Sequence, residues 1–443
     1  MIAPSICLWL VCMKTVGFKL IFLADELWDS LPSGPQVTNG WLWHFFQYEL
    51  CLGTLVYWWA GSTCPGRRWQ QGKSVGEGQA TIWCLLGKKA GDNTQVRALA
   101  EALAVGYQEK HIIARPWELL THLALKITLA GIDTAQSSAL EAPWPDLVIS
   151  AGRRNEPVAR WIQQQSGGRT RLVHIGRPWA PLPSWDLVIT TPQYFLPVSP
   201  NILHNSLPLH RVSAQHLRGE GEQLLPLIAH LPRPRIAVLM GGDSGRFVMT
   251  EQKGRQLGEW AHRLAKRAQG SLLVTDSART PPGAGDAMQA QLQGPHLCHR
   301  WGKDGGNPYQ GLLALADAFV VTGESMSMLG EAAETGRPMY IFDMGDGSSP
   351  WWRLGHSYRY KPMSHRLAMR IAPQRMRRDV GRIQDALVNS GRAQWLTGEM
   401  LEDAASALQH APSLGDVSRE APSLARQELQ RSAAAVRQLL TAR

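Results

Sequence analysis

The sequence predicts an α/β fold with two Rossmann-like domains that face a cleft, and a helical tail at the C-terminus. Three observations indicate this class: short apolar strands alternate with helices, the alternation breaks and restarts once at a proline-rich joint, and two strands run into small-residue turns. Strands that are apolar on both faces are typical of parallel sheets covered by helices on both sides. A chain of 443 residues suits two domains of roughly 150 residues with appendages.

The first 78 residues differ from the rest in composition. Four of the six cysteines and six of the 18 tryptophans lie before residue 65. Residues 41–60 have about the length that spans a bilayer, but His44, Gln47 and Glu49 count against a span. The segment lacks a good secretory signal. Its interpretation therefore stays open between a membrane element and an atypical or misassigned start.

The first domain is expected at residues 79–230, where strand-loop-helix units repeat. An apolar strand at 82–86 precedes a loop at 87–93 and a helix at 96–103, whose apolar residues recur at helical spacing. The later elements are a strand at 146–152, a helix at 157–162 and strands at 172–175 and 186–190.

The second domain is expected at residues 231–390 and the helical tail at 391–443. Prolines within 231–235 break the pattern, and the composition after Leu401 is biased toward residues that favour helices. Ligands of open parallel sheets lie beyond the carboxyl ends of the strands, so we expect the loops of both domains around one cleft. The strands of this domain are predicted at 236–240, 271–275, 318–321 and 339–342.

Two strand ends in the second domain predict a phosphate site. Each runs into a turn of small residues and then a helix, at 236–245 and at 318–331. Glycine lets the backbone approach a diphosphate closely, and the N–H groups and positive dipole end of the helix supply the counter-charge. Two such turns indicate a nucleotide-linked ligand. The predicted donors are Gly241, Gly242 and Ser244 in one turn and Gly323, Ser325 and Ser327 in the other.

The charge distribution indicates which classes of binding partner fit, and the cysteine content indicates the redox environment. The formal net charge is +10, and residues 353–382 hold nine Lys or Arg against the single Asp379. A basic face seeks an anionic partner; lipid headgroups, an acidic glycan and nucleic acid all fit, and a solvated helix face is the plainer alternative. The six cysteines form no CxxC pair and have no metal-ligand spacing with His, so we expect a reduced, metal-free cytosolic protein.

Six segments that follow one order along the chain carry a resemblance. Together they resemble the elongated-mitochondria type of mitochondrial fission protein family, whose many bacterial members are assigned as glycosyltransferases. The resemblance covers roughly residues 80–390 and leaves the first 78 residues outside. The segments are Gly87–Asn93, Ile149–Arg154, His174–Pro178, Thr190–Tyr194, Trp301–Tyr309 and Val321–Met328.

The resemblance implies a GT-B arrangement in which the second domain holds most of a nucleotide-sugar donor. Residues 324–331 also resemble the donor-binding segment of the undecaprenyl-diphospho-muramoylpentapeptide N-acetylglucosaminyltransferases, in which an acidic residue binds the donor ribose. Glu331 takes that place here, and it lies four residues after Ser327 on the same face of a helix. The plainer alternative is that Gly323 only permits a tight turn and that Glu331 is a solvated helix residue.

An inverting transferase also needs a base that deprotonates the acceptor hydroxyl. Asp92 is the candidate, and its alternative role is to cap a helix beginning near Thr94. Arg153, Arg154 and Arg177 follow strand ends. They are candidates to hold an anionic acceptor or a diphosphate, and the alternative is that they are exposed loop arginines without function.

Other nucleotide enzymes are disfavoured. The Gly87-Lys88 loop lacks the spacing of a Walker loop, which weakens kinase and ATPase interpretations. No G-x-G-x-x-G follows the first strand of either half, which disfavours a dehydrogenase. His174 lies near a strand end, and we expect it to be a satisfied core histidine.

We hypothesise a metal-independent glycosyltransferase, without cofactor, that moves a sugar from a nucleotide-sugar donor to a glycan or lipid-linked acceptor of the cell envelope. The basic stretch at 353–382 motivates a peripheral position on the anionic inner face of the cytoplasmic membrane, and no nucleic-acid partner is expected. Two other classes stay open. A nucleotide-sugar epimerase would need no acceptor, and a non-catalytic membrane-associated adaptor would keep the fold as a binding surface.

Overall fold

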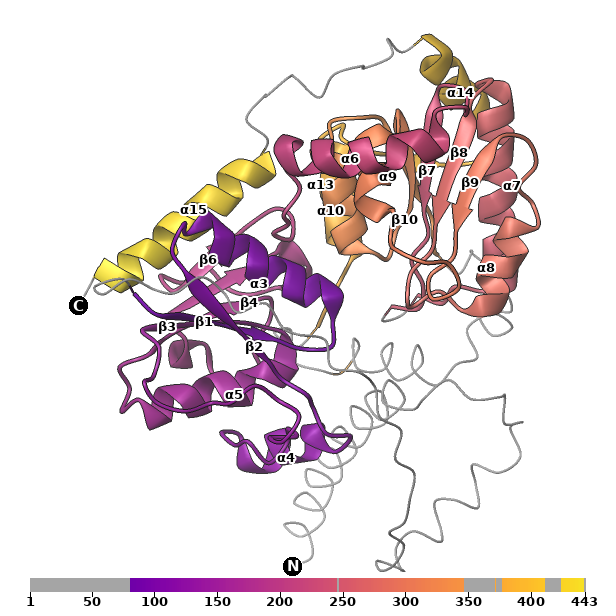
Figure 1. Cartoon of the computed structure of the whole chain (residues 1–443). Coiled ribbons are helices and arrows are strands. Elements are labelled where there is room, and N and C mark those ends of the chain that lie inside the picture. Colours follow the sequence, from indigo (N-terminus) through magenta and orange to yellow (C-terminus); the bar gives the residue numbers. More distant parts are fainter. Residues whose placement is uncertain (1–79, 245–246, 346–370, 372–376, 411–423, 442–443) are drawn as a thin grey trace, which may run out of the picture.

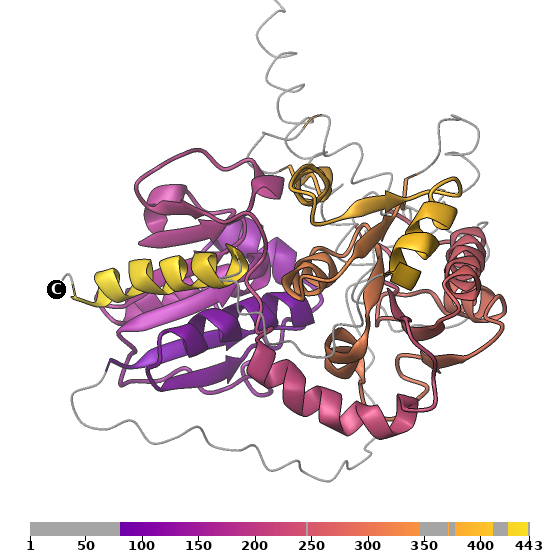
Figure 2. The same cartoon turned by 90° about the horizontal axis from the view of Figure 1, so that it is seen from above.

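The computed structural model describes residues 80–244, 247–345, 371, 377–410 and 424–441. These residues form two parallel sheets of six strands each, with helices packed against them (Figure 1). The view from above separates the two domains and shows the C-terminal helix lying along the first (Figure 2). The predicted class, an α/β fold with two Rossmann-like domains and a C-terminal helix, is confirmed.

The first sheet has the strand order β2-β1-β3-β4-β5-β6. Two apolar cores lie on its opposite faces, one under α3 and one under α5. The strands are β1 (Ile82–Leu86), β2 (Tyr107–His111), β3 (Leu147–Ala151), β4 (Arg171–Ile175), β5 (Leu187–Thr190) and β6 (Ile202–His204). The helices are α3 (Ala90–Ala102), α4 (Glu118–Leu125), α5 (Gly152–Gln165) and the 3₁₀ turns η1 (Leu182–Ser184) and η2 (Pro192–Tyr194).

The second sheet has the order β12-β11-β10-β7-β8-β9. Its strands are β7 (Arg235–Leu239), β8 (Ser271–Thr275), β9 (His296–His299), β10 (Ala318–Thr322), β11 (Met339–Phe342) and β12 (Gln394–Leu396). Its helices are α7 (Glu251–Arg267), α8 (Pro282–Gln289), α9 (Tyr309–Leu315), α10 (Met326–Glu334), α13 (Gly381–Asn389) and α14 (Leu401–His410). Two further helices are α6 (Ala214–Ile228) and α15 (Leu424–Thr441).

Burial of the central strands explains why the sequence pattern was readable. Every residue of β1, β3, β7, β8 and β10 is buried. Strands that are buried on both faces need continuous apolar sequence, and parallel pairing needs a crossover helix between them. The strand order of each sheet reverses direction once, between β1 and β3 in the first and between β7 and β10 in the second. Such switch points are where open α/β sheets bind ligands.

Two helices pack on a domain other than the one that their sequence position suggests. Helix α6 precedes residue 230 but packs against α9, with Leu224 in the core of the second domain. Helix α15 returns to the first domain, where Ala433 and Val436 join the core around α3. We therefore propose a boundary between the domains that lies before α6, with α15 as the closing helix of the first.

The expected membrane elements fall mostly outside the described residues. The first 78 residues are outside, and so is most of the basic stretch at 353–382. Within the described part of the chain, no helix combines the length and apolarity needed to cross a bilayer.

Helix α15 should contribute to stability through Glu428. The buried Glu428 carboxylate accepts hydrogen bonds from the backbone N of Ser206 at 2.7 Å and from its Oγ at 2.8 Å. Glu428→Ala would leave the half-buried N–H of Ser206 without its acceptor, and a donor left unsatisfied away from water costs about 1–3 kcal/mol. We expect a lower unfolding midpoint in urea, whereas Glu259→Ala on the exposed face of α7 should change stability by no more than about 0.5 kcal/mol. Equal effects of the two variants would show that α15 is not held through Glu428.

Candidate functional site

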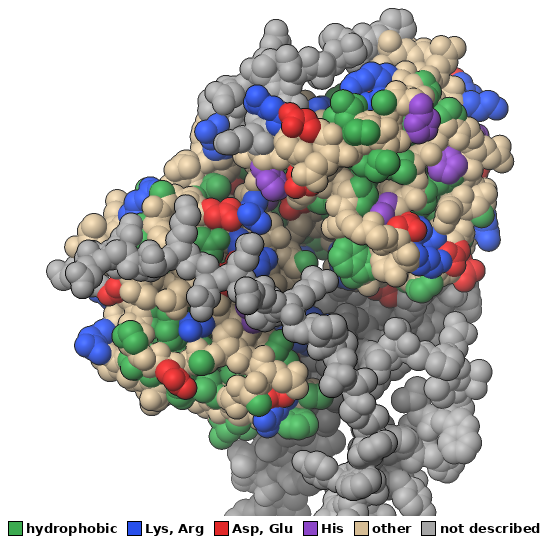
Figure 3. All heavy atoms as spheres, viewed as in Figure 1, with side chains coloured by type: hydrophobic (Ala, Val, Ile, Leu, Met, Phe, Trp, Pro, Cys, Tyr) green, Lys and Arg blue, Asp and Glu red, His purple; other side chains and the backbone are tan. Residues whose placement is uncertain are grey.

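Three helices begin at the carboxyl edge where the two domains face each other. Helix α3 follows β1, α5 follows β3, and α10 follows β10. A Cβ atom at Gly91 would lie 2.9 Å from Ser327 Oγ, so the first turns of α3 and α10 meet across the domains. The space-filling view shows charged and histidine side chains gathered where the domains meet (Figure 3). Free N–H groups and positive dipole ends make this edge suited to an anion.

Asp92 lies inside this junction. Its carboxylate rests against Gly152, the first residue of α5, and leaves no room there for a Cβ. Gly152 has φ +71°, which glycine adopts without strain. The alternative that Asp92 caps a helix near Thr94 is wrong, because α3 begins at Ala90 and Asp92 is in its first turn. The cap position belongs to Lys89, so the expected loop at 87–93 is shorter than predicted.

The turn after β7 differs from the prediction. Helix α7 begins only at Glu251, so Gly241, Gly242 and Ser244 are in a longer loop and not at a helix N-terminus. The N–H of Gly241 donates to Thr322 Oγ1 at 2.8 Å, and the N–H of Gly242 donates to Glu324 Oε1 at 2.8 Å. The two N–H groups expected to face a phosphate therefore bind the β10 edge instead. The glycines allow this close approach, since a Cβ at Gly241 would clash with Glu324.

The turn after β10 does lie at a helix N-terminus. Ser325 is the cap residue of α10, and Ser327 in the first turn faces Gly91 of the first domain. The carbonyl of Gly323 accepts a hydrogen bond from Gln384 Nε2 at 2.6 Å, so α13 stabilises the conformation of this turn. The structure thus places Ser327 against Gly91, the residue that precedes Asp92 in the first turn of α3.

Glu331 is buried on α10 and is not the solvated helix residue of the plainer interpretation. Its Oε2 accepts a hydrogen bond from the Tyr309 hydroxyl at 2.5 Å. Burial raises the pKa of Glu331 to about 7, although the bond from Tyr309 acts in the opposite direction. Burial also raises the pKa of the Tyr309 hydroxyl. A carboxyl group with a pKa near neutrality is a feature of functional sites.

Sequence reasoning missed Glu324 and Arg279, which lie beside the α10 turn. Glu324 is fully buried, and among the described residues its Oε2 has no hydrogen-bond partner. Burial raises the pKa of this carboxyl group. The Arg279 guanidinium approaches Glu324 Oε1 to 3.7 Å and Ser325 Oγ to 3.5 Å, while 43% of its side chain is exposed. Arg279 follows the end of β8 in the sequence, which is the signal that could have found it.

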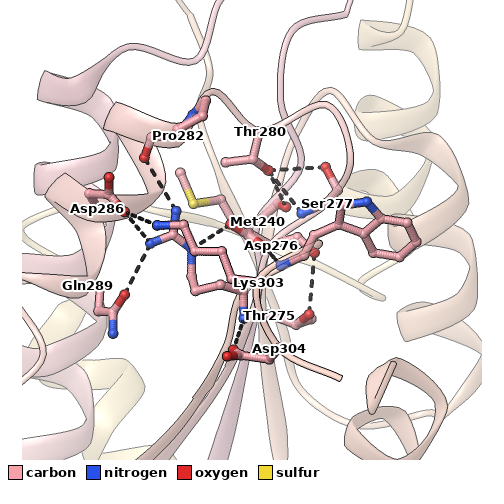
Figure 4. A network of polar contacts seen from close by, with 12 residues as sticks. Met240, Thr275, Asp276, Ser277, Thr280, Pro282, Asp286, Gln289, Lys303 and Asp304 are labelled. Carbon is pink, nitrogen blue, oxygen red and sulfur yellow. Dashed lines mark hydrogen bonds and ion pairs between the residues drawn. The ribbon is translucent and has the colours of Figure 1, made fainter. Parts of the chain in front are cut away.

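Arg300 locks the loops that carry these residues. The buried guanidinium donates from Nε to Asp276 Oδ2 at 2.7 Å and from Nη1 to Asp286 Oδ1 at 2.7 Å. The backbone N of Trp301 donates to the other oxygen of Asp276 at 2.5 Å. Figure 4 shows these contacts joining the loops after β8 and β9. Buried, charge-assisted bonds of this kind fix loop geometry, so Arg279 is held near α10 by a rigid support.

The first-domain arginines are less available than predicted. Arg153 donates from both terminal nitrogens to Glu118 at 3.1 and 3.0 Å, and Arg154 Nε donates to the same carboxylate at 2.8 Å. One buried acidic side chain therefore offsets part of their combined charge. Arg177 lies over the ring of Tyr194 at 5.8 Å, and burial lowers its pKa to about 10. They are not exposed loop arginines.

His174 is a buried core histidine, as expected, but only one of its two ring nitrogens has a hydrogen-bond partner among the described residues. Its Nδ1 lies 3.1 Å from Ser150 Oγ and its ring centroid lies 4.6 Å from that of Trp185. Its Nε2 has no partner among the described residues. Burial lowers the pKa of His174 to about 4, so the ring is neutral at neutral pH.

The described end of the basic stretch contacts the first domain. Gln193 accepts from Arg378 Nε at 3.0 Å through its side chain and from the Asp379 N–H at 2.8 Å through its carbonyl. The Arg382 guanidinium lies 4.1 Å from the centroid of the Phe195 ring. These cations therefore join the two domains, and they lead directly into α13, whose Gln384 holds the α10 turn.

Comparison with known proteins identifies one matching family and two similar proteins. A family model described as mitochondrial fission ELM1 matches residues 90–413. The mitochondrial fission protein ELM1 of Arabidopsis thaliana is 26% identical over 239 residues, which cover 49% of this chain and 56% of that protein. This chain thus spans little more than half the length of that relative. An uncharacterized protein of Rickettsia prowazekii is 25% identical over 297 residues, covering 59% of this chain and 82% of that protein.

Solved structures show only a distant likeness. The UDP-GlcNAc 2-epimerase of Methanocaldococcus jannaschii covers 81% of this chain and 99% of its own, with 9% identity and a TM-score of 0.47. The spinosyn forosaminyltransferase SpnP covers 82% and 99%, with 13% identity and a TM-score of 0.44. Likeness at this level carries no conclusion about activity. Because the family match extends over most of the sequence, the chain belongs to the mitochondrial fission ELM1 family.

Proposed function

We propose that this protein is a glycosyltransferase that binds a nucleotide-sugar donor in its second domain and transfers the sugar to a cell-envelope acceptor. The observation that carries the proposal is the meeting of α10 and α3 at Ser327 and Gly91. An anion-binding helix N-terminus on one domain thereby faces a carboxylate, Asp92, on the other. Donor and base are the two parts that sugar transfer requires at one place.

The second domain offers a complementary group for each part of a nucleoside diphosphate. The N-terminus of α10 and the exposed Arg279 guanidinium would hold the diphosphate, because the leaving group gains negative charge as the glycosidic bond breaks. Glu331 would accept hydrogen bonds from the ribose hydroxyls. The residues expected in the turn after β7, Gly241 and Gly242, would act indirectly by seating Glu324 under this turn.

Asp92 would act as the base. Its carboxylate takes the proton of the acceptor hydroxyl while the acceptor oxygen forms a bond to the anomeric carbon. The bond from that carbon to the diphosphate breaks, and its electron pair leaves on the diphosphate. Asp92 lies in the first turn of α3, and its carboxylate contacts Gly152, the first residue of α5.

The acceptor side is proposed to take an anionic, lipid-linked glycan at the inner face of the cytoplasmic membrane. Arg153, Arg154 and Arg177 lie at the carboxyl edge of the first sheet, next to Asp92. Glu118 binds the guanidinium groups of Arg153 and Arg154 and thereby orients them toward one side.

A non-catalytic adaptor is the second candidate, and one observation favours it. The N–H groups of Gly241 and Gly242 already bind within the protein. A fold whose anion-binding groups are satisfied internally could serve as a surface for a partner, as the name of the Arabidopsis relative would suit. Absence of nucleotide binding would favour the adaptor, and turnover of the donor without an acceptor would favour an epimerase.

A thermal-shift screen of the full chain tests the donor site. UDP, GDP, CMP and their sugar conjugates are compared, since a ligand that binds only the native state raises the unfolding midpoint. We expect one nucleotide family to raise the midpoint of the parent, and a smaller rise or none in Glu331→Ala. Glu259→Ala, on the exposed side of α7, is the matched control and should respond like the parent. No shift with any nucleotide would contradict the donor site.

The pH dependence should reveal Glu331. Its pKa of about 7 in the folded protein lies above that of the unfolded chain, so the folded state holds its proton more tightly. Stability from this group is therefore lost as pH rises through about 7. The unfolding midpoint of Glu331→Gln relative to the parent should increase between pH ~5 and ~8. A difference that does not change with pH would show that Glu331 ionises normally.

Arg279 should contribute to donor affinity. A hydrogen bond to a charged group contributes about 1.5–3 kcal/mol, so Arg279→Ala should weaken nucleotide diphosphate binding by roughly tenfold or more. Arg255→Ala, exposed on α7, serves as the control for loss of one positive charge. Calorimetry with the nucleotide found in the screen measures both. Equal affinities of the two variants would remove Arg279 from the proposed site.

A further inference from the structure

A lobe between β2 and β3 projects from the first domain. We define it as residues 113–130, which include α4. Its base is closed by a bridge between Ala114 and Ile132 and by hydrogen bonds from Arg115 N to Gly131 O at 2.9 Å and from Asp133 N to Ile113 O at 2.8 Å. Figure 1 shows α4 at the end of this domain, beyond α5 and away from the second sheet. The lobe is thus a compact projection with a defined conformation.

The lobe exposes large apolar side chains. Ile113 is 43% exposed, Trp117 is 49% exposed and Leu125 is 58% exposed. Pro116 and Ala124 beside them are also exposed. Single exposed apolar residues are ordinary, but a group of them on one projection marks an interaction surface.

The charged side chains that the lobe exposes to solvent are positive. Between residues 112 and 132 the sequence holds one acidic residue, Glu118, and its side chain is buried against Arg153 and Arg154. The cations are Lys126, which is exposed, and Arg115, whose guanidinium lies 5.6 Å from the centroid of the Trp117 ring. The exposed surface therefore combines apolar side chains with positive charge and lacks a negative one.

We propose that the 113–130 lobe docks the protein on an anionic lipid bilayer. Tryptophan favours the interface between headgroups and acyl chains, leucine favours the acyl side, and Lys or Arg is attracted to anionic headgroups. Charge complementarity thus selects a lipid surface as the occupant over an uncharged protein face. Arg378 and Arg382, from the basic stretch first assigned to the membrane, are instead engaged with Gln193 and Phe195.

The position of the lobe fits the proposed acceptor side. Glu118 is the first residue of α4 and binds Arg153 and Arg154 in the first turn of α5. Asp92 rests against Gly152 at the start of the same helix. A bilayer under the lobe would place lipid-borne substrates next to the first-domain part of the candidate site. The choice of acceptor rests on the proposed function, whereas the docking itself does not.

Vesicle flotation of the full chain tests the docking. Vesicles of phosphatidylcholine with phosphatidylglycerol are compared with phosphatidylcholine alone, for the parent and for Trp117→Glu combined with Leu125→Glu. We expect the parent to float with the anionic vesicles. The vesicle-bound fraction of the double variant should be lower by about tenfold or more, because two apolar anchors become charged. Val198→Glu combined with Leu227→Glu is the matched control, since Val198 is 95% exposed and Leu227 is 63% exposed outside the lobe.

A second variant tests the charge of the lobe, and two further measurements distinguish a loss of membrane docking from a loss of folding or of nucleotide binding. Lys126→Glu should reduce flotation with anionic vesicles while leaving the apolar side chains in place. All variants should keep the parent's unfolding midpoint and its response to nucleotide, so failure of the donor site leaves this test intact. The proposal is overturned if the parent does not float, if the lobe variants float like the parent, or if they only abolish self-association measured by light scattering without vesicles.

Discussion

The candidate site depends on the close approach of two helix N-termini, one from each domain. Gly91 on α3 leaves room for Ser327 on α10, because a Cβ at position 91 would lie 2.9 Å from the serine Oγ and would force that side chain to shift. Two connections outside the site maintain this approach. Arg382 on α13 contacts Phe195 of the first domain, next to Arg378, which binds Gln193, and Gln384 on the same helix holds the turn that starts α10. Because one short helix makes both contacts, the distance between domains and the shape of the α10 turn are coupled.

Burial gives the two sides of this junction different electrostatic properties. In the second domain, Glu324 and Glu331 are buried with raised pKa values, and Arg279 stays partly exposed next to them. A raised pKa favours the neutral form of a carboxyl group, which reduces the negative charge that a diphosphate would meet. In the first domain, Glu118 binds Arg153 and Arg154 and holds their guanidinium groups in place. The second domain thus places a partly exposed guanidinium beside two carboxyl groups with raised pKa values. The first domain instead holds two guanidinium groups against one carboxylate.

The fold was predictable where burial alone decides the residue type. The strands at 82–86 and 271–275 agree with β1 and β8, because a strand buried on both faces has to be apolar throughout. The strand β2 was missed, since its residues Tyr107–His111 are polar and only half-buried at the edge of the sheet. The packing of α6 on α9 was also missed, because local sequence does not specify which of two cores a linking helix joins.

The site was predictable only where one loop contains the signal. The turn before α10 was found from its glycine and serines, and burial of Glu331 could not be foreseen because it depends on Tyr309, which comes from another helix. The turn after β7 was misread for the same reason. Glu324, which is distant in sequence, takes the N–H of Gly242, and no local pattern distinguishes that partner from a phosphate. Arg279 is placed by contacts between loops that are distant in sequence, since its Nη1 donates to the carbonyl of Asp243 in the loop after β7.

The most direct test of the account is a crystal structure of the full chain with a bound nucleoside diphosphate. The account predicts the diphosphate between the first turn of α10 and Arg279, the ribose against Glu331, and the terminal phosphate directed toward Asp92 across the domain junction. A nucleotide seated elsewhere, or crystals grown at saturating nucleotide with α10 and Arg279 unliganded, would contradict it.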